Sequence, residues 1–247
     1  MSTEHVEDYQ EAFARIERSV DAGDANLRGQ GFWKLVDQVK LEPRLAHHWA
    51  DVAGRIDAKA FEARVRPRFP VWLGNTLLLT ATVVLAALVP VALALAEGFD
   101  RPRPGWGGLL ILVAAGGLSV TVHDLAHWVA GRLGSIRFVG YFLDGPFRIQ
   151  PGLKVDYASY LRASPRARAT MHAAGALASK AAPFAVFAPA YIRHARMGYE
   201  LLPSWSLWAV LALGALQIVT DVAWSTKFSD WKKVRRELRL GRMQRSV

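Results

Sequence analysis

The sequence contains no cysteine, and this absence restricts its covalent and metal chemistry. Neither a disulfide framework nor a thiolate ligand is possible, so any bound metal must be held by histidine, aspartate or glutamate. Residues 1–70 contain no long apolar run, and the first twenty are polar and acidic without the pattern of a signal peptide. From Val71 onward, long apolar runs recur with short charged breaks between them. We therefore expect a soluble N-terminal region, 1–70, then a membrane-embedded region, 71–235, and a basic cytoplasmic tail, 236–247.

Acidic residues are also scarce, because 21 Asp and Glu stand against 31 Lys and Arg, which gives a formal net charge of +10. A basic chain can bind nucleic acid, but a hydrophobic content of 52% and the positions of the charges favour a membrane protein. Four apolar runs are long enough to cross a bilayer core of about 30 Å. They are Val71 to Ala96, Trp106 to about Ala130, Ala169 to Ile192, and Trp205 to about Ser225.

The basic residues around these runs predict their orientation. Eleven Lys and Arg precede the first run, seven lie between the second and the third, and eight follow the fourth, whereas the other two connections carry two each. By the positive-inside rule, both termini and the central loop face the cytoplasm. We expect an integral protein of a prokaryotic cell membrane, mostly helical, with about four transmembrane helices. The charge then requires no nucleic-acid partner.

The N-terminal region shows helical periodicity in two stretches, separated by a loop over Asp21 to Gly31. Their apolar residues recur every three or four positions. These are Val6, Tyr9, Phe13, Ile16 and Val20 in the first stretch, and Leu45, Trp49, Val52, Ile56 and Phe61 in the second. A small helical cytoplasmic region is expected, as a cap on the membrane region, a surface for self-association or a binding site for a cytoplasmic partner.

The central loop, Arg132 to Arg168, has a different composition. The segments IRFVGYFL and FRIQPGLKVDY are rich in β-formers and are separated by Asp144-Gly145-Pro146, a turn signal. We expect a hairpin or two short strands at the cytoplasmic rim. An exposed strand there could accept an extended peptide by edge addition, although a simple structured connector explains the segment equally well.

The segment HDLAH, residues His123 to His127, lies inside the second apolar run. Two histidines four apart on a helix project from one face, one turn apart, and can bind a single zinc ion. Asp124 would lie near the open position of that metal, where a carboxylate can accept a proton from water during hydrolysis. Ionisable side chains are costly in hydrocarbon, so three within five residues favour a functional site.

A third ligand has to come from another helix, because hydrolytic zinc sites use three protein ligands. The segment DVAWSTKFSD offers two candidates, Asp221 at the end of the fourth apolar run and Asp230 just beyond it. Geometry inferred from the sequence does not choose between them. His172, at the start of the third run, can stabilise an oxyanion or orient a ligand, or it is an interfacial histidine without a catalytic part. Lys180 and Asp221 are further intramembrane charges, and each needs a partner or a water-filled cavity.

Three segments together resemble the site-2 protease family of intramembrane zinc metalloproteases. HDLAH resembles the HExxH motif of that family, and AGALASK, Ala174 to Lys180, is similar to its AGPLAN-like run of small residues. DVAWSTKFSD is similar to the family segment that runs from an asparagine to an Asp-Gly pair. The resemblance covers about residues 71 to 235 and leaves the N-terminal region outside.

The resemblance implies a zinc site held by His123, His127 and Asp230, with Asp124 as general base and Asp221 at the position of the family's asparagine. It also implies membrane-protein or peptide substrates, cleaved near the cytoplasmic face. Because transmembrane helices hide their carbonyls in internal hydrogen bonds, such a substrate must unwind before it is cleaved.

The sequence departs from the family at several positions. Asp124 replaces glutamate and is shorter by one methylene, Trp231 replaces the glycine after the ligand aspartate, and Ala176 and Ser179 replace proline and asparagine. One alternative is therefore a non-catalytic relative that binds membrane segments or partner proteins. Another is a four-helix haem or electron-transfer protein with His127 and His172 as axial ligands, although it gives Asp124 no role. We expect glycines such as Gly175 to allow close helix packing.

Overall fold

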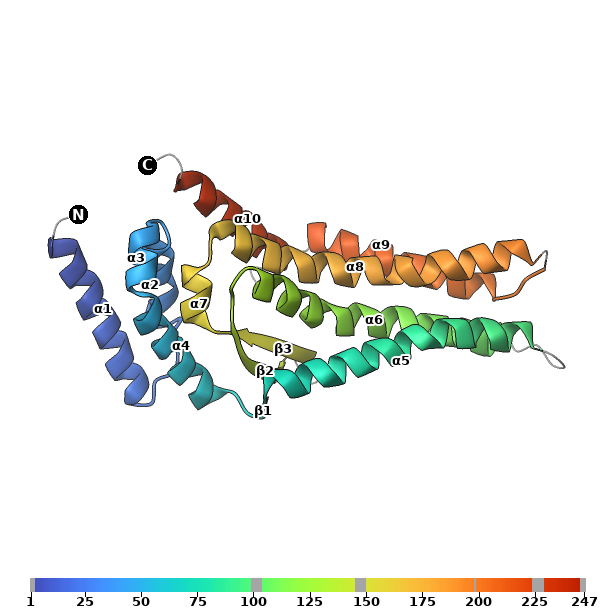
Figure 1. The fold of residues 1–247 in the computed structure, drawn as a ribbon, viewed down its shortest axis with the longest axis horizontal. Helices are drawn as coiled ribbons and strands as arrows, with labels where there is room; N and C mark the ends of the chain where they lie inside the picture. The colour runs from blue at the N-terminus through green and yellow to red at the C-terminus, as the bar shows by residue number, and fades with distance from the viewer. Residues whose placement is uncertain (1–2, 99–103, 145–149, 198, 224–228, 245–247) are drawn as a thin grey trace. The chain divides into compact units, whose positions relative to one another are not determined.

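The computed structural model describes residues 3–98, 104–144, 150–197, 199–223 and 229–244 (Figure 1). These residues are mostly helical, as predicted, and include one small antiparallel sheet. They divide into two compact units. Unit 1 comprises Met1–Val71, Ala130–Thr170 and Arg235–Val247, and unit 2 comprises Trp72–Val129 and Met171–Val234.

Unit 1 contains the N-terminal helices, the sheet and a short helix that follows it. The helices are α1 (Thr3–Asp21), α2 (Phe32–Val39), α3 (Pro43–His48), α4 (Ala50–Arg64) and α7 (Tyr157–Arg162). Three residues of the predicted apolar stripe of α1, Phe13, Ile16 and Val20, are buried, and Tyr9 is half-buried. The ring of Phe13 lies 5.3 Å from that of Trp49 and 6.3 Å from that of Phe32, between centroids. Unit 1 therefore has its own apolar core, built by segments that lie far apart in the sequence.

The sheet of unit 1 has the strand order β1-β2-β3, with β1 (Arg68–Phe69), β2 (Phe138–Asp144) and β3 (Gln150–Val155). Both pairs are antiparallel, and Tyr141 of β2 pairs with Phe69 on one side and with Leu153 on the other. The register shifts between Phe138 and Gly140, which marks a β-bulge. The predicted strands are confirmed, while most of the predicted turn after Asp144 lies outside the described residues.

Unit 2 is built around four long helices that run side by side (Figure 1). They are α5 (Val71–Glu97), α6 (Pro104–Leu133), α8 (Pro165–Arg196) and α9 (Ser204–Ala223). Helix α10 (Asp230–Met243) follows them, with residues 230–234 in unit 2 and the rest in unit 1. Small and branched residues from the four helices form one apolar cluster. It includes Ala92, Ile111, Ala115, Val186 and Val210.

Three of these helices, α5, α6 and α9, are long and apolar enough to cross a membrane. They correspond to the first, second and fourth predicted spans. The third predicted span is also a helix, α8, but α8 is not among the three. Its alanine-rich sequence contains Lys180 and two internal prolines, Pro183 and Pro189, so it is less hydrophobic than its neighbours. Nevertheless Ala182, Val186 and Ala190 of α8 belong to the buried cluster of the bundle.

Candidate metal centre

The two histidines of HDLAH lie one turn apart on α6, as their spacing predicts. Their ring centroids are 4.6 Å apart, and Nε2 of His123 lies 3.2 Å from Nε2 of His127. The side chain of His127 is nearly buried, whereas that of His123 is 33% exposed. The pair therefore presents two ring nitrogens to one point, which remains accessible on the His123 side.

The other ring nitrogen of each histidine contacts the backbone of α8. Nδ1 of His123 lies 3.0 Å from the carbonyl oxygen of Gly175, and Nδ1 of His127 lies 2.7 Å from that of Met171. A carbonyl oxygen only accepts hydrogen bonds, so each Nδ1 must carry the proton and donate it. Each Nε2 of a neutral ring is then left with a lone pair, which is the state that binds a metal.

Gly175 gives the His127 ring the space that it occupies. A Cβ atom at position 175 would lie 2.5 Å from Cδ2 and Cε1 of that ring and still closer to Nε2. Real Cβ atoms do not approach other heavy atoms so closely, and the ring is held on its other side by the carbonyl of Met171. Gly175 therefore allows close packing, as expected, and it leaves room for the ring of a candidate ligand, His127.

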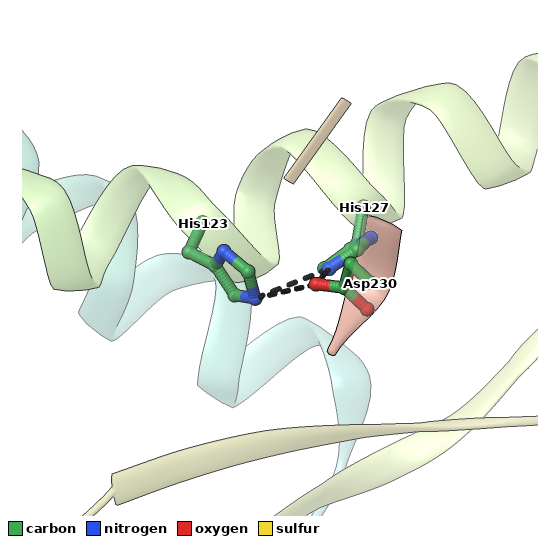
Figure 2. A group of neighbouring side chains, drawn as sticks. All are labelled: His123, His127 and Asp230. Carbon is green, nitrogen blue, oxygen red and sulfur yellow. Dashed lines mark hydrogen bonds and ion pairs between the residues drawn. The ribbon is translucent and has the colours of Figure 1, made fainter. Parts of the chain in front are cut away.

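Asp230, the first residue of α10, completes the group (Figure 2). Its Oδ2 atom lies 3.2 Å from Nε2 of His127 and 3.4 Å from Nε2 of His123. Burial alone would raise the pKa of the Asp230 carboxyl. The neighbouring rings of His127 and His172 and the ammonium of Lys233 outweigh burial and hold that pKa well below its ordinary range. Asp230 therefore offers a carboxylate, the charged form that a metal requires.

The donor set could hold a metal ion. His123, His127 and Asp230 each offer one ligand atom, and these atoms lie within 4.8 Å of one another. Two ligands at zinc distances and tetrahedral angles are separated by about 3.3 Å, which agrees with the separations given above. Once both Nδ1 atoms donate to α8, the three converging atoms are all acceptors and cannot hydrogen-bond to one another. A cation between them would remove this mutual repulsion.

Asp124, the predicted general base, is buried on α6 with only 6% of its surface exposed. Its Oδ2 atom has no hydrogen-bond partner among the described residues. The carboxyl is close enough to His127 and Asp230 to interact with them electrostatically. Buried polar atoms normally have a hydrogen-bond partner. A water molecule bound beside Asp124 would supply one.

The contacts of His172 and Asp221 distinguish between the roles predicted for these two residues. Nδ1 of His172 lies 3.5 Å from Oδ1 of Asp230, so His172 is positioned to orient this carboxylate. Asp221 instead forms an ion pair with Lys180, which also donates a hydrogen bond of 3.3 Å to the carbonyl oxygen of Ala176. Of the two candidate third ligands, Asp230 is the one that lies with the histidine pair.

Met171, Gly175 and Lys233 also contact this site, although none of them was assigned to it from the sequence. Met171 and Gly175 have the same spacing of four residues as the two histidines, and α8 runs opposite to α6 (Figure 1). That matched spacing is a signal only when both helices are known to be neighbours. Lys233 lies three residues after Asp230, a spacing typical of helical ion pairs, and its Nζ atom is 3.0 Å from Oδ1 of Asp230.

Comparisons of the chain with models of protein families, with curated proteins and with solved structures gave no match.

Proposed function

We propose that this protein is an intramembrane zinc metallopeptidase that hydrolyses peptide bonds of membrane-protein substrates near the cytoplasmic face. The observation that carries the proposal is the convergence of three acceptor atoms, from His123, His127 and Asp230, at zinc-ligand spacing. The two histidines belong to α6, a helix apolar enough to cross a membrane. The order of the three motifs along the chain, which resembles the site-2 protease family, supports the same conclusion.

The residues of the site divide the chemistry between them. A zinc ion bound there would polarise the scissile carbonyl and lower the pKa of water towards about 7. Asp124 would take the proton from the attacking water and pass it to the leaving amine, the role of a general base and acid. Its buried, unpartnered oxygen supports this assignment, and the exposure of His123 supports access from one side.

The proposal includes the topology and the substrate. We propose α8 as the fourth membrane crossing, because it shares the core of the bundle and its one mid-helix charge, Lys180, is paired with Asp221. Both termini then lie in the cytoplasm, as the basic residues predict. Strand β3 forms one edge of the sheet and suits an extended peptide, and residues 1–70 provide a surface for a cytoplasmic partner or for self-association.

The haem alternative has less support. It requires His127 and His172 to share an iron as axial ligands. However, Nε2 of His127 faces Nε2 of His123 and Oδ2 of Asp230, and Nδ1 of His127 is bound to the carbonyl of Met171.

The decisive experiment measures the metal content of the detergent-purified protein by elemental mass spectrometry, with His123→Ala as a matched variant. About one zinc per chain, lost in the variant, is the expected result. Iron would instead favour the haem protein, and the absence of any metal would contradict the proposal. Incubation of the zinc-loaded protein with fluorescein-labelled casein then separates an active peptidase from a non-catalytic relative that binds zinc but does not cleave.

A further inference from the structure

The two oxygens of the Asp230 carboxylate have different neighbours. Oδ2 faces the Nε2 atoms of His123 and His127. Oδ1 points to the other side, where it lies 3.0 Å from Nζ of Lys233 and 3.5 Å from Nδ1 of His172. The carboxylate is thus divided between the candidate metal position on the Oδ2 side and the nitrogen atoms of Lys233 and His172 near Oδ1.

This division matters for a catalytic zinc site. A carboxylate binds a metal through one oxygen or through both, and the second oxygen occupies an additional coordination position. Structural zinc sites are closed by protein ligands, whereas catalytic sites keep one position open. In a site with two histidines and one aspartate, the open coordination position therefore remains only if the aspartate binds through one oxygen.

We propose that Lys233 and His172 are positioning residues, which hold Oδ1 of Asp230 away from the metal and so keep a coordination position open. The inference rests on the zinc site of the proposed function and assigns that site a further property. Neither residue needs to touch a substrate for this role.

Three features of the structure support the assignment. Lys233 is on the same helix as Asp230, one turn along α10, so the backbone of the helix fixes their separation. His172 reaches the same oxygen from α8, and its side chain is buried. The Asp230 side chain is only 13% exposed, so water competes poorly for Oδ1. Helices α8 and α10 therefore each place a nitrogen atom near this one oxygen.

The test uses the full chain in detergent with Co²⁺ as the probe, because Co²⁺ replaces zinc and its visible absorption reports coordination number. The wild type is expected to show the intense bands of four-coordinate Co²⁺. In Lys233→Met, and more so in Lys233→Met with His172→Phe, these bands are expected to weaken and shift as the coordination number rises.

Two further variants separate positioning from general effects of charge or folding. Lys233→Arg keeps a cation at the same place and is expected to retain the wild-type spectrum. Lys232→Met removes the neighbouring, exposed lysine of the same helix and is expected to leave spectrum and affinity unchanged. A loss of signal in Lys232→Met equal to that in Lys233→Met would overturn the inference.

The outcomes also distinguish the two proposals. If the wild type binds no Co²⁺, the proposed metal site itself is wrong. If the wild type binds Co²⁺ but with five or more ligands, the metal site stands and the positioning role is wrong. Unchanged spectra in Lys233→Met and in the double variant would likewise reject the positioning role while leaving the metal site intact.

Discussion

The hydrogen atom that replaces a side chain at Gly175 decides where the His127 ring can lie. The carbonyl of Gly175 also accepts the hydrogen bond of His123, so this one residue contacts both histidines of the site. Substitution here tests whether the precise position of the rings matters for metal binding.

We expect Gly175→Ala to reduce zinc affinity by at least about 10-fold, because the new methyl group must displace the His127 ring from its place. Isothermal titration of zinc into the chelator-treated protein measures this effect. Gly116→Ala is the matched control, since a Cβ atom at that position on α6 meets nothing within 4 Å. Equal affinities in the two variants would show that the ring can move without cost.

Asp124 tests the chemical step separately from metal binding. Asn has nearly the same shape as Asp but cannot accept the proton, so Asp124→Asn is expected to lower casein cleavage by about 10²- to 10⁴-fold. Zinc content should remain about one per chain, because Asp124 is not one of the three clustered ligands. Elemental analysis of the same samples used for the cleavage assay checks both results. Full activity in Asp124→Asn would assign the base to another group.

Among the elements, α8 and α9 share an ion pair within unit 2. Lys180 and Asp221 are both largely covered, with 15% and 31% of their side chains exposed. Breaking a buried pair by removing one partner is costly, because the remaining charge keeps its desolvation penalty.

A double-mutant cycle measures this pair. Lys180→Met and Asp221→Leu are each expected to destabilise the detergent-solubilised protein by about 3 kcal/mol. The double variant should recover much of the loss, since no lone charge remains. Thermal unfolding followed by tryptophan fluorescence provides the measurement. Additive losses in the double variant would mean that the two charges do not interact.

The helices were the most predictable part of this fold. Three apolar runs agree with α5, α6 and α9 to within a few residues, because length and hydrophobicity suffice to define a helix in the membrane. The third run, α8, was predicted as a helix and as a span. The helix is confirmed, but its alanine-rich sequence is not among the helices apolar enough to cross a membrane. Helix α2, which begins directly after the loop that ends at Gly31, was not predicted. Strand β1 was not predicted either, because two residues are too few to show a periodic pattern.

The candidate site was predictable only in part. HDLAH defines two ligands because both lie on one helix, where spacing determines geometry. The choice between Asp221 and Asp230 depends on how α9 and α10 are connected, and no periodicity in the sequence contains that information. The contacts of Met171, Gly175 and Lys233 depend on which helices are neighbours, so they became visible only in the structure.

At the scale of the whole molecule, unit 1 joins segments from both ends of the chain through buried charges. Glu237 of α10 is fully buried, and its oxygens lie 3.2 Å from Nζ of Lys40 and 2.5 Å from Nε of Arg168. Tyr160 donates a hydrogen bond of 3.2 Å to the same carboxylate. Burial lowers the pKa of Lys40 to about 8, although the charge of Glu237 opposes this shift.

The stability of the protein should fall in acid, partly because of Glu237. Burial would raise the pKa of this carboxyl, but Lys40 and Arg168 outweigh burial and hold the pKa below 4.5. As the pH falls below 4.5, the unfolded chain binds this proton first, so the folded state loses stability. Hydrogen bonding from Arg55 also lowers the pKa of Glu17, to about 2. Glu17 therefore adds to the loss of folding stability as the pH falls.

Apparent melting temperatures between pH 7 and pH 3 test this prediction in the full-length protein. Glu237→Gln is expected to be less stable than the wild type at pH 7 by about 3 to 5 kcal/mol, because two buried cations lose their carboxylate. Its stability should also depend less on pH below 4.5. Glu11→Gln, on the exposed face of α1, controls for the loss of one carboxylate. Parallel pH profiles for wild type and Glu237→Gln would exclude this contribution.

The nitrogen and oxygen donors of His123, His127 and Asp230 also determine how the site responds to oxidants. Thiolate sites lose their ligands when cysteine is oxidised to a disulfide or a sulfenic acid. This chain has no thiol to oxidise, and its donors are less suited to soft ions such as Cu(I). Peroxide stress that empties cysteine-bound zinc sites should therefore leave the proposed metal in place, so its binding would outlast that of thiolate sites in the same cell.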